Sequence, residues 1–444
     1  MAKWAHLYPG QGSQYVGMGK KLRDDSETAR RVFEEADDLL GFRLSSVIFE
    51  GDPERLTRTD MTQPALLTVS VAAFRVLTER TGAEPDYAAG HSLGEWSALA
   101  CAGAIGFSDA IRLVSLRGRL MQEAAEEGGG AMCAVLGIDR EAVEETCRGL
   151  SAPGAEVVVS NINSPGQTVI SGRADAVRQA SERLERLGAR TAYLNVGAPF
   201  HSPLMAPAAE RLRAELKPQA FTLPRWPVVS NVTAVPYSSP EEIVRLLAEQ
   251  IVAPVRWEET MRFLRGAGVT AVVEIGPMTV LTRLAKAIEK EMSAFSFEKP
   301  EQWTELREGM KPFLERSSPA ARRFVARCLT AAAGTRNRNW DERAYREGVI
   351  EPYQAIEAIQ ARLDAEDRGP DIGEMAEALS LLVRIFETKG VPSAERVERL
   401  FEIVERTGTG DRFPQYALRV PEPATAPATD SAHPGGAANG LRIG

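Results

Sequence analysis

The pentapeptide Gly90-His-Ser-Leu-Gly94 is the segment of the sequence best suited to chemistry. It follows the apolar run Tyr87-Ala-Ala and precedes a helix-period segment that begins at Glu95. A serine at a tight strand-to-helix turn needs small neighbours, because the backbone there is strained and packs closely. Such a turn directs the hydroxyl toward a helix N-terminus, where free N–H groups stabilise an oxyanion. The pattern therefore predicts that Ser92 is a nucleophile.

A serine nucleophile needs a general base, and the chain has only four histidines. His6 lies in an apolar run that is typical of a core position, and His91 adjoins the serine at a turn, where consecutive side chains point apart. His433 lies in a tail that we expect to be disordered. His201, in a loop segment after an expected strand, remains by elimination as the candidate base. No Asp or Glu stands out as a third member of the set.

Two further segments are candidates for substrate binding. Arg117 lies in the helix-period stretch 115–121, and its planar fork could hold a carboxylate with two hydrogen bonds. The pattern alone nevertheless favours a solvated arginine on an amphipathic helix. The glycine-rich stretch 8–14 lacks both the spacing of a dinucleotide-binding loop and a P-loop lysine. It is better interpreted as a loop that exposes its backbone beside the active site.

Composition narrows the classes of function. The chain has 53 Lys and Arg against 61 Asp and Glu, a formal net charge of -8, which argues against a broad nucleic-acid-binding face. Its four cysteines are scattered and form no CxxC pair, so neither a disulfide framework nor a metal site is predicted. The N-terminal residues lack the apolar run of a signal peptide, and the uncharged stretch 61–74 is shorter than a membrane span. We therefore expect a cytoplasmic protein with no membrane partner.

A chain of 444 residues is too long for one ordinary domain. Up to about residue 300, short apolar runs alternate with helix-period segments, which predicts an α/β core formed by residues 1–127 and 197–300. Residues 128–196 have their own order of strand, helix, strand, strand, helix and strand, the ferredoxin-like pattern, and are interpreted as an inserted subdomain. Residues 301–418 predict an all-α appendage, and the Pro/Ala/Thr/Gly-rich residues 419–444 predict a disordered tail.

Five segments together resemble malonyl-CoA:acyl-carrier-protein transacylases and the related acyltransferase domains of polyketide synthases. In chain order they are Pro9–Gln14, Gly90–Glu95, Arg117–Gln122, Phe200–Pro203 and Glu274–Pro277. The resemblance covers about residues 1–300, and five segments in register are far more specific than one serine turn. It departs from the family at Trp96, where a smaller aromatic residue is frequent, and it does not cover the residues after about 300.

The resemblance implies an α/β-hydrolase-like core that carries the ferredoxin-like insert. It also implies that Ser92 is the nucleophile and His201 its base. The backbone N–H groups of Gln11 and Leu93 would form the oxyanion hole. A backbone carbonyl rather than an acid orients the histidine in this family, and the matching position is Gln250. An acidic third member is therefore not required.

The same resemblance assigns the substrate pocket. Arg117 would hold the malonyl carboxylate, and Met121 belongs to the same set of substrate-binding residues. Phe200, directly before the histidine, favours malonyl over methylmalonyl because its ring would crowd an α-methyl group. One methyl group discriminates by only about 1–3 kcal/mol in an apolar pocket.

The implied activity is transfer of a malonyl group from malonyl-CoA, through an acyl-Ser92 intermediate, to the phosphopantetheine thiol of an acyl carrier protein. Such an enzyme supplies fatty-acid synthesis or polyketide synthesis, in the latter case as a discrete acyltransferase, and needs no permanently bound cofactor. The alternatives are an acyl hydrolase that clears carrier proteins and a catalytically silent docking subunit. Arg283, Lys286 and Lys290 on one helix could form a basic patch for an acidic carrier protein, although the pattern itself favours a solvated helix face.

Overall fold

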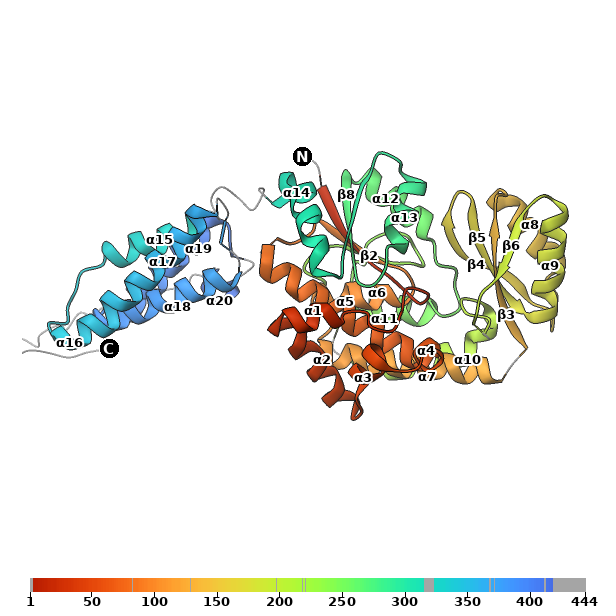
Figure 1. Ribbon diagram of the computed structural model, residues 1–444, viewed down its shortest axis with the longest axis horizontal. Coiled ribbons are helices and arrows are strands. Elements are labelled where there is room, and N and C mark those ends of the chain that lie inside the picture. Colours follow the sequence, from red (N-terminus) through yellow and green to blue (C-terminus); the bar gives the residue numbers. More distant parts are fainter. Residues whose placement is uncertain are drawn as a thin grey trace, which may run out of the picture. The chain divides into compact units, whose positions relative to one another are not determined.

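The computed structural model describes residues 3–81, 83–127, 129–196, 198–217, 219, 221–314, 323–366, 369–370, 372–410 and 413–417. The chain divides into two compact units, one formed by residues 1–319 with 368–374 and the other by residues 320–367 with 375–444 (Figure 1). The predicted disordered tail, residues 419–444, lies outside the described residues.

A parallel five-stranded sheet forms the centre of the first unit, with the strand order β7-β2-β1-β8-β9. Its strands are β1 (Lys3–Tyr8), β2 (Tyr87–Gly90), β7 (Val228–Val229), β8 (Val269–Ile275) and β9 (Ser293–Phe297). Most residues of β1, β2 and β8 are buried, as the near-continuous apolar runs of parallel strands require when helices cover both faces. Tyr8 pairs with Gly90, so the segments that follow β1 and β2 leave the sheet side by side.

Helices cover both faces of this sheet, and the strand residues alternate between them. Tyr8 and Val273 pack in the core formed with α5 (Thr59–Thr81) and α7 (Phe107–Glu126). Leu7 and Val272 pack in the core formed with α12 (Trp257–Gly266) and α13 (Val280–Ile288). The other helices of this unit are α1 (Lys20–Asp25), α2 (Glu27–Leu40), α3 (Leu44–Glu50), α4 (Pro53–Thr57), α6 (Leu93–Cys101), α10 (Ala206–Leu216), α11 (Pro240–Glu249) and α14 (Trp303–Leu314), with the 3-10 helices η1 (Pro203–Met205) and η2 (Pro300–Gln302).

The helix α14 belongs to the first unit, although the sequence pattern assigned residues from 301 onward to the appendage. Leu306 and Met310 are buried in the same core as α5 and α7. At Gly309 the helix lies so close to β9 that a Cβ atom would be 2.2 Å from the ring of Phe295. Periodicity identifies the apolar face of α14 but cannot tell which neighbour covers that face.

A second, antiparallel sheet is formed by residues 129–193 with the strand order β4-β5-β3-β6. Its elements run in the expected order: β3 (Gly130–Leu136), α8 (Arg140–Leu150), β4 (Val157–Ser164), β5 (Gln167–Arg173), α9 (Ala174–Arg186) and β6 (Arg190–Tyr193). The helices α8 and α9 cover one face, where Cys133 and Ile170 are buried. The opposite face contributes Met132, Ala134 and Val169 to the main core of the unit. Strand β4 of this sheet also contacts α12 and α13, which cover the parallel sheet.

The second unit is helical, as the sequence predicted, and has a separate core. Its elements are α15 (Phe324–Ala333), α16 (Glu342–Tyr345), the π-helix η4 (Arg346–Ile350), α17 (Glu351–Ala365), α18 (Ile372–Thr388), α19 (Ser393–Thr407) and α20 (Pro414–Ala417). Leu379, Leu382 and Phe386, three of the periodic apolar positions of α18, are buried in that core. Lys389 is also buried, and its Nζ donates hydrogen bonds to the carbonyls of Ala332 at 2.7 Å and Thr335 at 3.0 Å, which satisfies the C-terminal end of α15.

The helix α5 is long and apolar enough to cross a membrane by length and composition. However, 83% of its most apolar window is buried inside the structure. It contacts α7, α2 and α6, and its apolar side chains belong to the main core. We therefore interpret α5 as a core helix of the first unit.

Gly94 provides a test of how closely α6 approaches β1. A Cβ atom on Gly94 would lie 1.9 Å from the carbonyl oxygen of Tyr8. We expect Gly94→Ala to lower the free energy of unfolding by about 2–4 kcal/mol, since backbone must move to admit the methyl group. Gly149→Ala is the control, because Gly149 lies in α8 with no atom within 4 Å of its would-be Cβ. That control should gain about 0.5–1 kcal/mol from helix propensity. Chemical denaturation of both variants measures the difference, and equal effects would contradict the close approach.

Candidate active site

Ser92 lies at the turn between β2 and α6, where the sequence predicted a nucleophile. Its backbone has φ 51° and ψ -105°, a conformation that non-glycine residues rarely adopt and that stores strain. The turn is held by hydrogen bonds from the N–H of His91 to the carbonyl of Tyr8 (3.0 Å) and from the N–H of Gly94 to the carbonyl of His91 (2.9 Å). A Cβ on Gly90 would lie 1.9 Å from the backbone of Gly94, so the small residues of the motif are required by space.

His201 is the histidine that reaches the serine. Its Nε2 lies 2.8 Å from Ser92 Oγ, and its Nδ1 lies 2.7 Å from the backbone carbonyl oxygen of Gln250. Because a carbonyl oxygen only accepts, Nδ1 carries the hydrogen and the Nε2 lone pair faces the serine hydroxyl. Burial, and then the positive charge of Arg117, lower the pKa of His201 to about 3. The imidazole is therefore neutral near pH 7 and available as a base.

Arg117 is buried, so the solvated-face interpretation of its helix pattern is wrong. Its Nη1 donates to Gln63 Oε1 at 2.7 Å, and its Nη2 donates to Gln250 Oε1 at 3.0 Å and to Ser92 Oγ at 3.2 Å. Its Nε has no hydrogen-bond partner, and no carboxylate among the described residues forms an ion pair with it. Burial lowers the pKa of the guanidinium to about 10, which leaves it charged at neutral pH. A buried, charged fork with a spare donor beside the serine suits a carboxylate ligand.

A cavity of about 240 Å³ joins these groups. Of the residues singled out from the sequence, its lining includes Gln11, Ser92, Leu93, Arg117, Met121, Phe200 and His201. Gln250 lies behind them and is buried. The antiparallel sheet supplies Met132 and Val169 to the lining, and α13 supplies Leu281 and Leu284. The cavity thus lies where the two sheets meet, with a polar end at the serine and apolar walls.

Three residues that sequence reasoning did not single out complete the site. Asn231 Oδ1 accepts the N–H of Ser92 at 2.7 Å, and Gln63 holds Arg117 as described above. Glu95, in the first turn of α6, accepts the side-chain amide of Gln250 at 2.5 Å. Glu95 directly follows the serine motif in the sequence, and this position could have identified it as a site residue. Nothing local in the sequence marks Asn231, because its partner is 139 residues away.

His91 and His6 have structural surroundings, and His433 lies outside the described residues. His91 Nε2 lies 2.9 Å from Asn163 Oδ1, which ties the serine turn to the antiparallel sheet. His6 is buried among Trp4, Phe74 and Trp226, and burial lowers its pKa to about 3. Among the described residues no cluster of three or more His, Cys, Asp or Glu could hold a metal ion.

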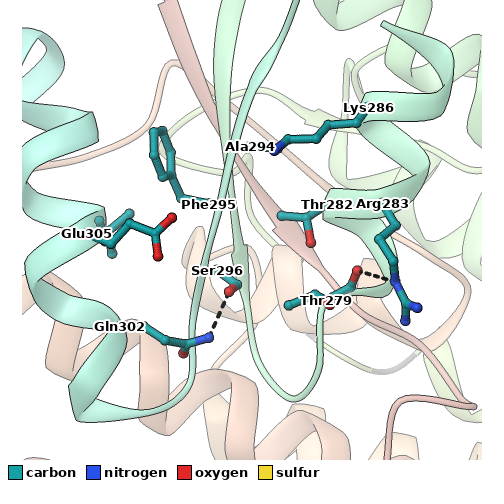
Figure 2. A pocket seen from close by; sticks show the side chains of 10 residues that line it. Thr279, Thr282, Arg283, Lys286, Ala294, Phe295, Ser296, Gln302 and Glu305 are labelled. Atoms are coloured by element: carbon teal, nitrogen blue, oxygen red, sulfur yellow. Dashed lines mark hydrogen bonds between the residues drawn. The ribbon is translucent and has the colours of Figure 1, made fainter. Parts of the chain in front are cut away.

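A second hollow, of about 400 Å³, lies between α13, β9 and α14 (Figure 2). Arg283 and Lys286 extend from α13 on one side of it, and Glu305 extends from α14 on the other. Arg283 Nε donates to the carbonyl of Thr279 at 3.1 Å. No pair of nucleophile and base lines this hollow, so the smaller cavity is the candidate active site.

Comparison with known proteins agrees with this geometry. The family model of the acyl transferase domain matches residues 5–304. A malonyl CoA-acyl carrier protein transacylase of Bacillus subtilis is 36% identical over 400 residues, which cover 90% of this chain and 100% of the relative. The protein of the same name from Bacillus subtilis strain 168 is 46% identical over 302 residues, which cover 68% of this chain and 95% of the relative.

Among solved structures, a malonyl-transacylase in complex with its type II polyketide synthase acyl-carrier protein is similar to this chain. It aligns with a TM-score of 0.68 and 44% identity, and the match covers 69% of this chain and 100% of that one. The resemblance noted in the sequence is thus confirmed by sequence relatives and by structure. The chain belongs to the family of malonyl-CoA:acyl-carrier-protein transacylases.

Proposed function

We propose that this protein transfers a malonyl group from malonyl-CoA to the phosphopantetheine thiol of an acyl carrier protein, through a malonyl ester on Ser92. One observation carries the proposal: Ser92 Oγ lies 2.8 Å from the base His201 and 3.2 Å from the buried guanidinium of Arg117. A nucleophile and a carboxylate-binding cation therefore share one cavity. The names of the relatives, which are malonyl CoA-acyl carrier protein transacylases, agree with this chemistry.

The loading half-reaction follows from these contacts. His201 Nε2 takes the proton of Ser92 as Oγ attacks the thioester carbonyl. The backbone N–H groups of Gln11 and Leu93 hold the oxyanion, the carbon–sulfur bond breaks, and the proton passes to the departing thiolate of CoA. In the second half-reaction the thiol of the carrier protein gives its proton to His201 and attacks the ester. Ser92 then regains the proton, and the malonyl thioester of the carrier is released.

Arg117 has a second effect on the base. Its charge is one of the causes that lower the pKa of His201. When the malonyl carboxylate pairs with the guanidinium, that charge is compensated, and the pKa of His201 rises toward the range in which general bases work best. A neutral acetyl group brings no such compensation. Arg117 would thus select a carboxylated acyl group both by binding it and by activating the base.

The cavity walls favour transfer over hydrolysis. Met121, Met132, Phe200 and Leu281 surround the serine with apolar groups. Apolar walls of this kind hold few water molecules beside a malonyl ester on Ser92. This argument disfavours the acyl hydrolase that the sequence left open.

Further assignments from the sequence stay proposals. We place residues 1–127 and 197–300 in an α/β-hydrolase-like core and residues 128–196 in a ferredoxin-like insert. The predicted helical appendage of residues 301–418 then begins after α14, because α14 packs with the first unit. The element order and the sheet orders support these names. We also propose a cytoplasmic location and a supply role in fatty-acid or polyketide synthesis. Arg283 and Lys286, which line the hollow of Figure 2, are candidates to meet an acidic carrier protein.

The role of Ser92 is tested by intact-mass measurement after incubation with malonyl-CoA. We expect one malonyl adduct on the wild type, stable in the absence of a carrier protein, and none on Ser92→Ala. Ser97→Ala is the control, because Ser97 is a buried serine of the same helix whose hydroxyl has no hydrogen-bond partner. An adduct that survives Ser92→Ala would remove this residue from the mechanism. Rapid release of malonate without carrier would favour the hydrolase.

The role of Arg117 is tested by comparing malonyl and acetyl loading of Ser92. Arg117→Ala should slow malonyl loading by about 100-fold, the effect of removing one partner of a buried charge pair, and should leave acetyl loading unchanged or faster. Arg119→Ala is the control on the same helix, since Arg119 is exposed and bonds only Ser115. Equal loss of both acyl groups would rule out a carboxylate-binding role.

The role of Phe200 is tested with methylmalonyl-CoA. Phe200→Ala should raise methylmalonyl loading relative to malonyl loading by about tenfold, because a ring that crowds the α-methyl group is removed. The ratio of the two initial rates, measured by intact mass, checks this expectation. An unchanged ratio would show that another wall of the cavity makes the distinction.

A further inference from the structure

The side-chain amide of Gln250 bridges two buried charges. Its Oε1 accepts a hydrogen bond from Arg117 Nη2 at 3.0 Å, and its Nε2 donates to Glu95 Oε2 at 2.5 Å. The same Nε2 donates to the backbone carbonyl of Ser92 at 2.9 Å. All three side chains are about 1% exposed. A cation, an amide dipole and an anion therefore lie in a row directly behind the nucleophile.

Glu95 dictates which way this amide points. An ionised carboxylate only accepts hydrogen bonds, so every neighbour must donate to it. The backbone N–H of Asn231 donates to Oε1 at 3.1 Å, and the hydroxyl of Tyr237 donates to the same oxygen. Gln250 must then present its NH₂ group to Glu95, which leaves its oxygen facing Arg117. The backbone carbonyl of Ser92 favours the same amide orientation. Glu95 contributes more to it, because a hydrogen bond to a charged acceptor is about twice as strong as one between neutral groups.

The opposite amide orientation would harm the guanidinium. A flipped Gln250 would set its NH₂ group against the Nη2 donor of Arg117, donor against donor. Arg117 would retain only Gln63 and Ser92 Oγ as acceptors, and would be free to turn away from the place where a carboxylate must bind. The orientation of one amide thus decides where the fork of Arg117 points.

We propose that Glu95 is a positioning residue that holds Arg117 through the Gln250 amide and thereby determines the preference for carboxylated over neutral acyl groups. This proposal rests on the proposed function. Glu95 does not touch the reacting atoms, and its effect is expected on selectivity rather than on the attack itself. The contact with His201 uses the backbone carbonyl of Gln250, not its side chain.

The ionisation of Glu95 makes the preference for carboxylated acyl groups depend on pH. The titratable and charged groups around Glu95 are Arg117, His201 and Tyr237, with Glu242 beyond the tyrosine. Burial raises the pKa of Glu95 to about 7, burial and the charge of Glu95 raise that of Tyr237, and the pKa of His201 is about 3. Hydrogen bonds from Ser238 lower the pKa of Glu242. Between pH 8 and 6 Glu95 is thus the member of this group that takes up a proton, and it loses its charge as the pH falls.

The test compares loading of Ser92 from malonyl-CoA and acetyl-CoA in full-length Glu95→Gln, by rapid quench and intact mass. We expect the ratio of malonyl to acetyl loading rates to fall about tenfold or more, the effect of losing a hydrogen bond to a charged group. Acetyl loading should fall much less than malonyl loading, because a neutral acyl group does not pair with Arg117. Glu95→Asp, which keeps the charge, should recover part of the ratio.

The matched control is Glu298→Gln. Glu298 is another buried carboxylate of the first unit, and it accepts hydrogen bonds from Tyr15 Oη at 2.7 Å and the N–H of Gly19 at 2.8 Å. Its substitution should cost stability without changing the malonyl-to-acetyl ratio. A second measurement follows the pH dependence of the ratio at acyl-CoA concentrations well below saturation, where the rates report the pKa values of the free enzyme. In the wild type the ratio should fall between pH 8 and 6, and in Glu95→Gln this fall should be absent.

Two results would overturn the proposal. Equal slowing of malonyl and acetyl loading in Glu95→Gln would mean that Glu95 only supports the serine turn. A wild-type ratio that is constant between pH 8 and 6 would contradict it even if the variant failed to fold. Failure of the proposed function is a different observation, because wild-type Ser92 would then carry no malonyl adduct at all.

Discussion

The hydrogen bond from the His201 ring to the backbone carbonyl of Gln250 is the contact on which the site depends. It fixes the tautomer that leaves a lone pair facing Ser92, and it does so without a buried acid. Because the acceptor is backbone, the side chain of Gln250 is free for another task, the contact with Arg117. One residue therefore contacts both His201, the proposed base, and Arg117, the proposed carboxylate-binding cation.

That contact requires segments that are far apart in the chain to meet. The serine turn follows β2, His201 follows the antiparallel sheet, and Gln250 ends α11. The parallel sheet sets the position of the serine, since its neighbour strand β1 contacts the turn through Tyr8. The antiparallel sheet closes the cavity from the other side with Met132 and Val169. The cavity of the proposed reaction is lined by the segments that follow β1 and β2 on one side and by the antiparallel sheet on the other.

The helical unit has its own core. It is not peculiar to this chain. An alignment of 400 residues with the Bacillus subtilis relative must extend well beyond residue 304, where the match to the acyl transferase domain ends. Part of the second unit is therefore shared with that transacylase. The residues proposed for the chemistry, Ser92, His201 and Arg117, all belong to the first unit.

The sequence by itself determined whatever depends on local spacing. Gly90 and Gly94 identify the strained turn at Ser92, because the glycines that the close packing requires lie in the same five-residue segment as the serine. Periodicity identified the strands and helices of the antiparallel sheet and the C-terminal helices. Elimination among the four histidines identified His201, and the resemblance to the transacylase family identified Gln250. Tertiary structure decided the rest: which face of α7 is buried around Arg117, that α14 joins the first unit, and that Asn231 and Glu95 support the site. Burial and hydrogen bonds across more than a hundred residues depend on packing between elements, and no local pattern records them.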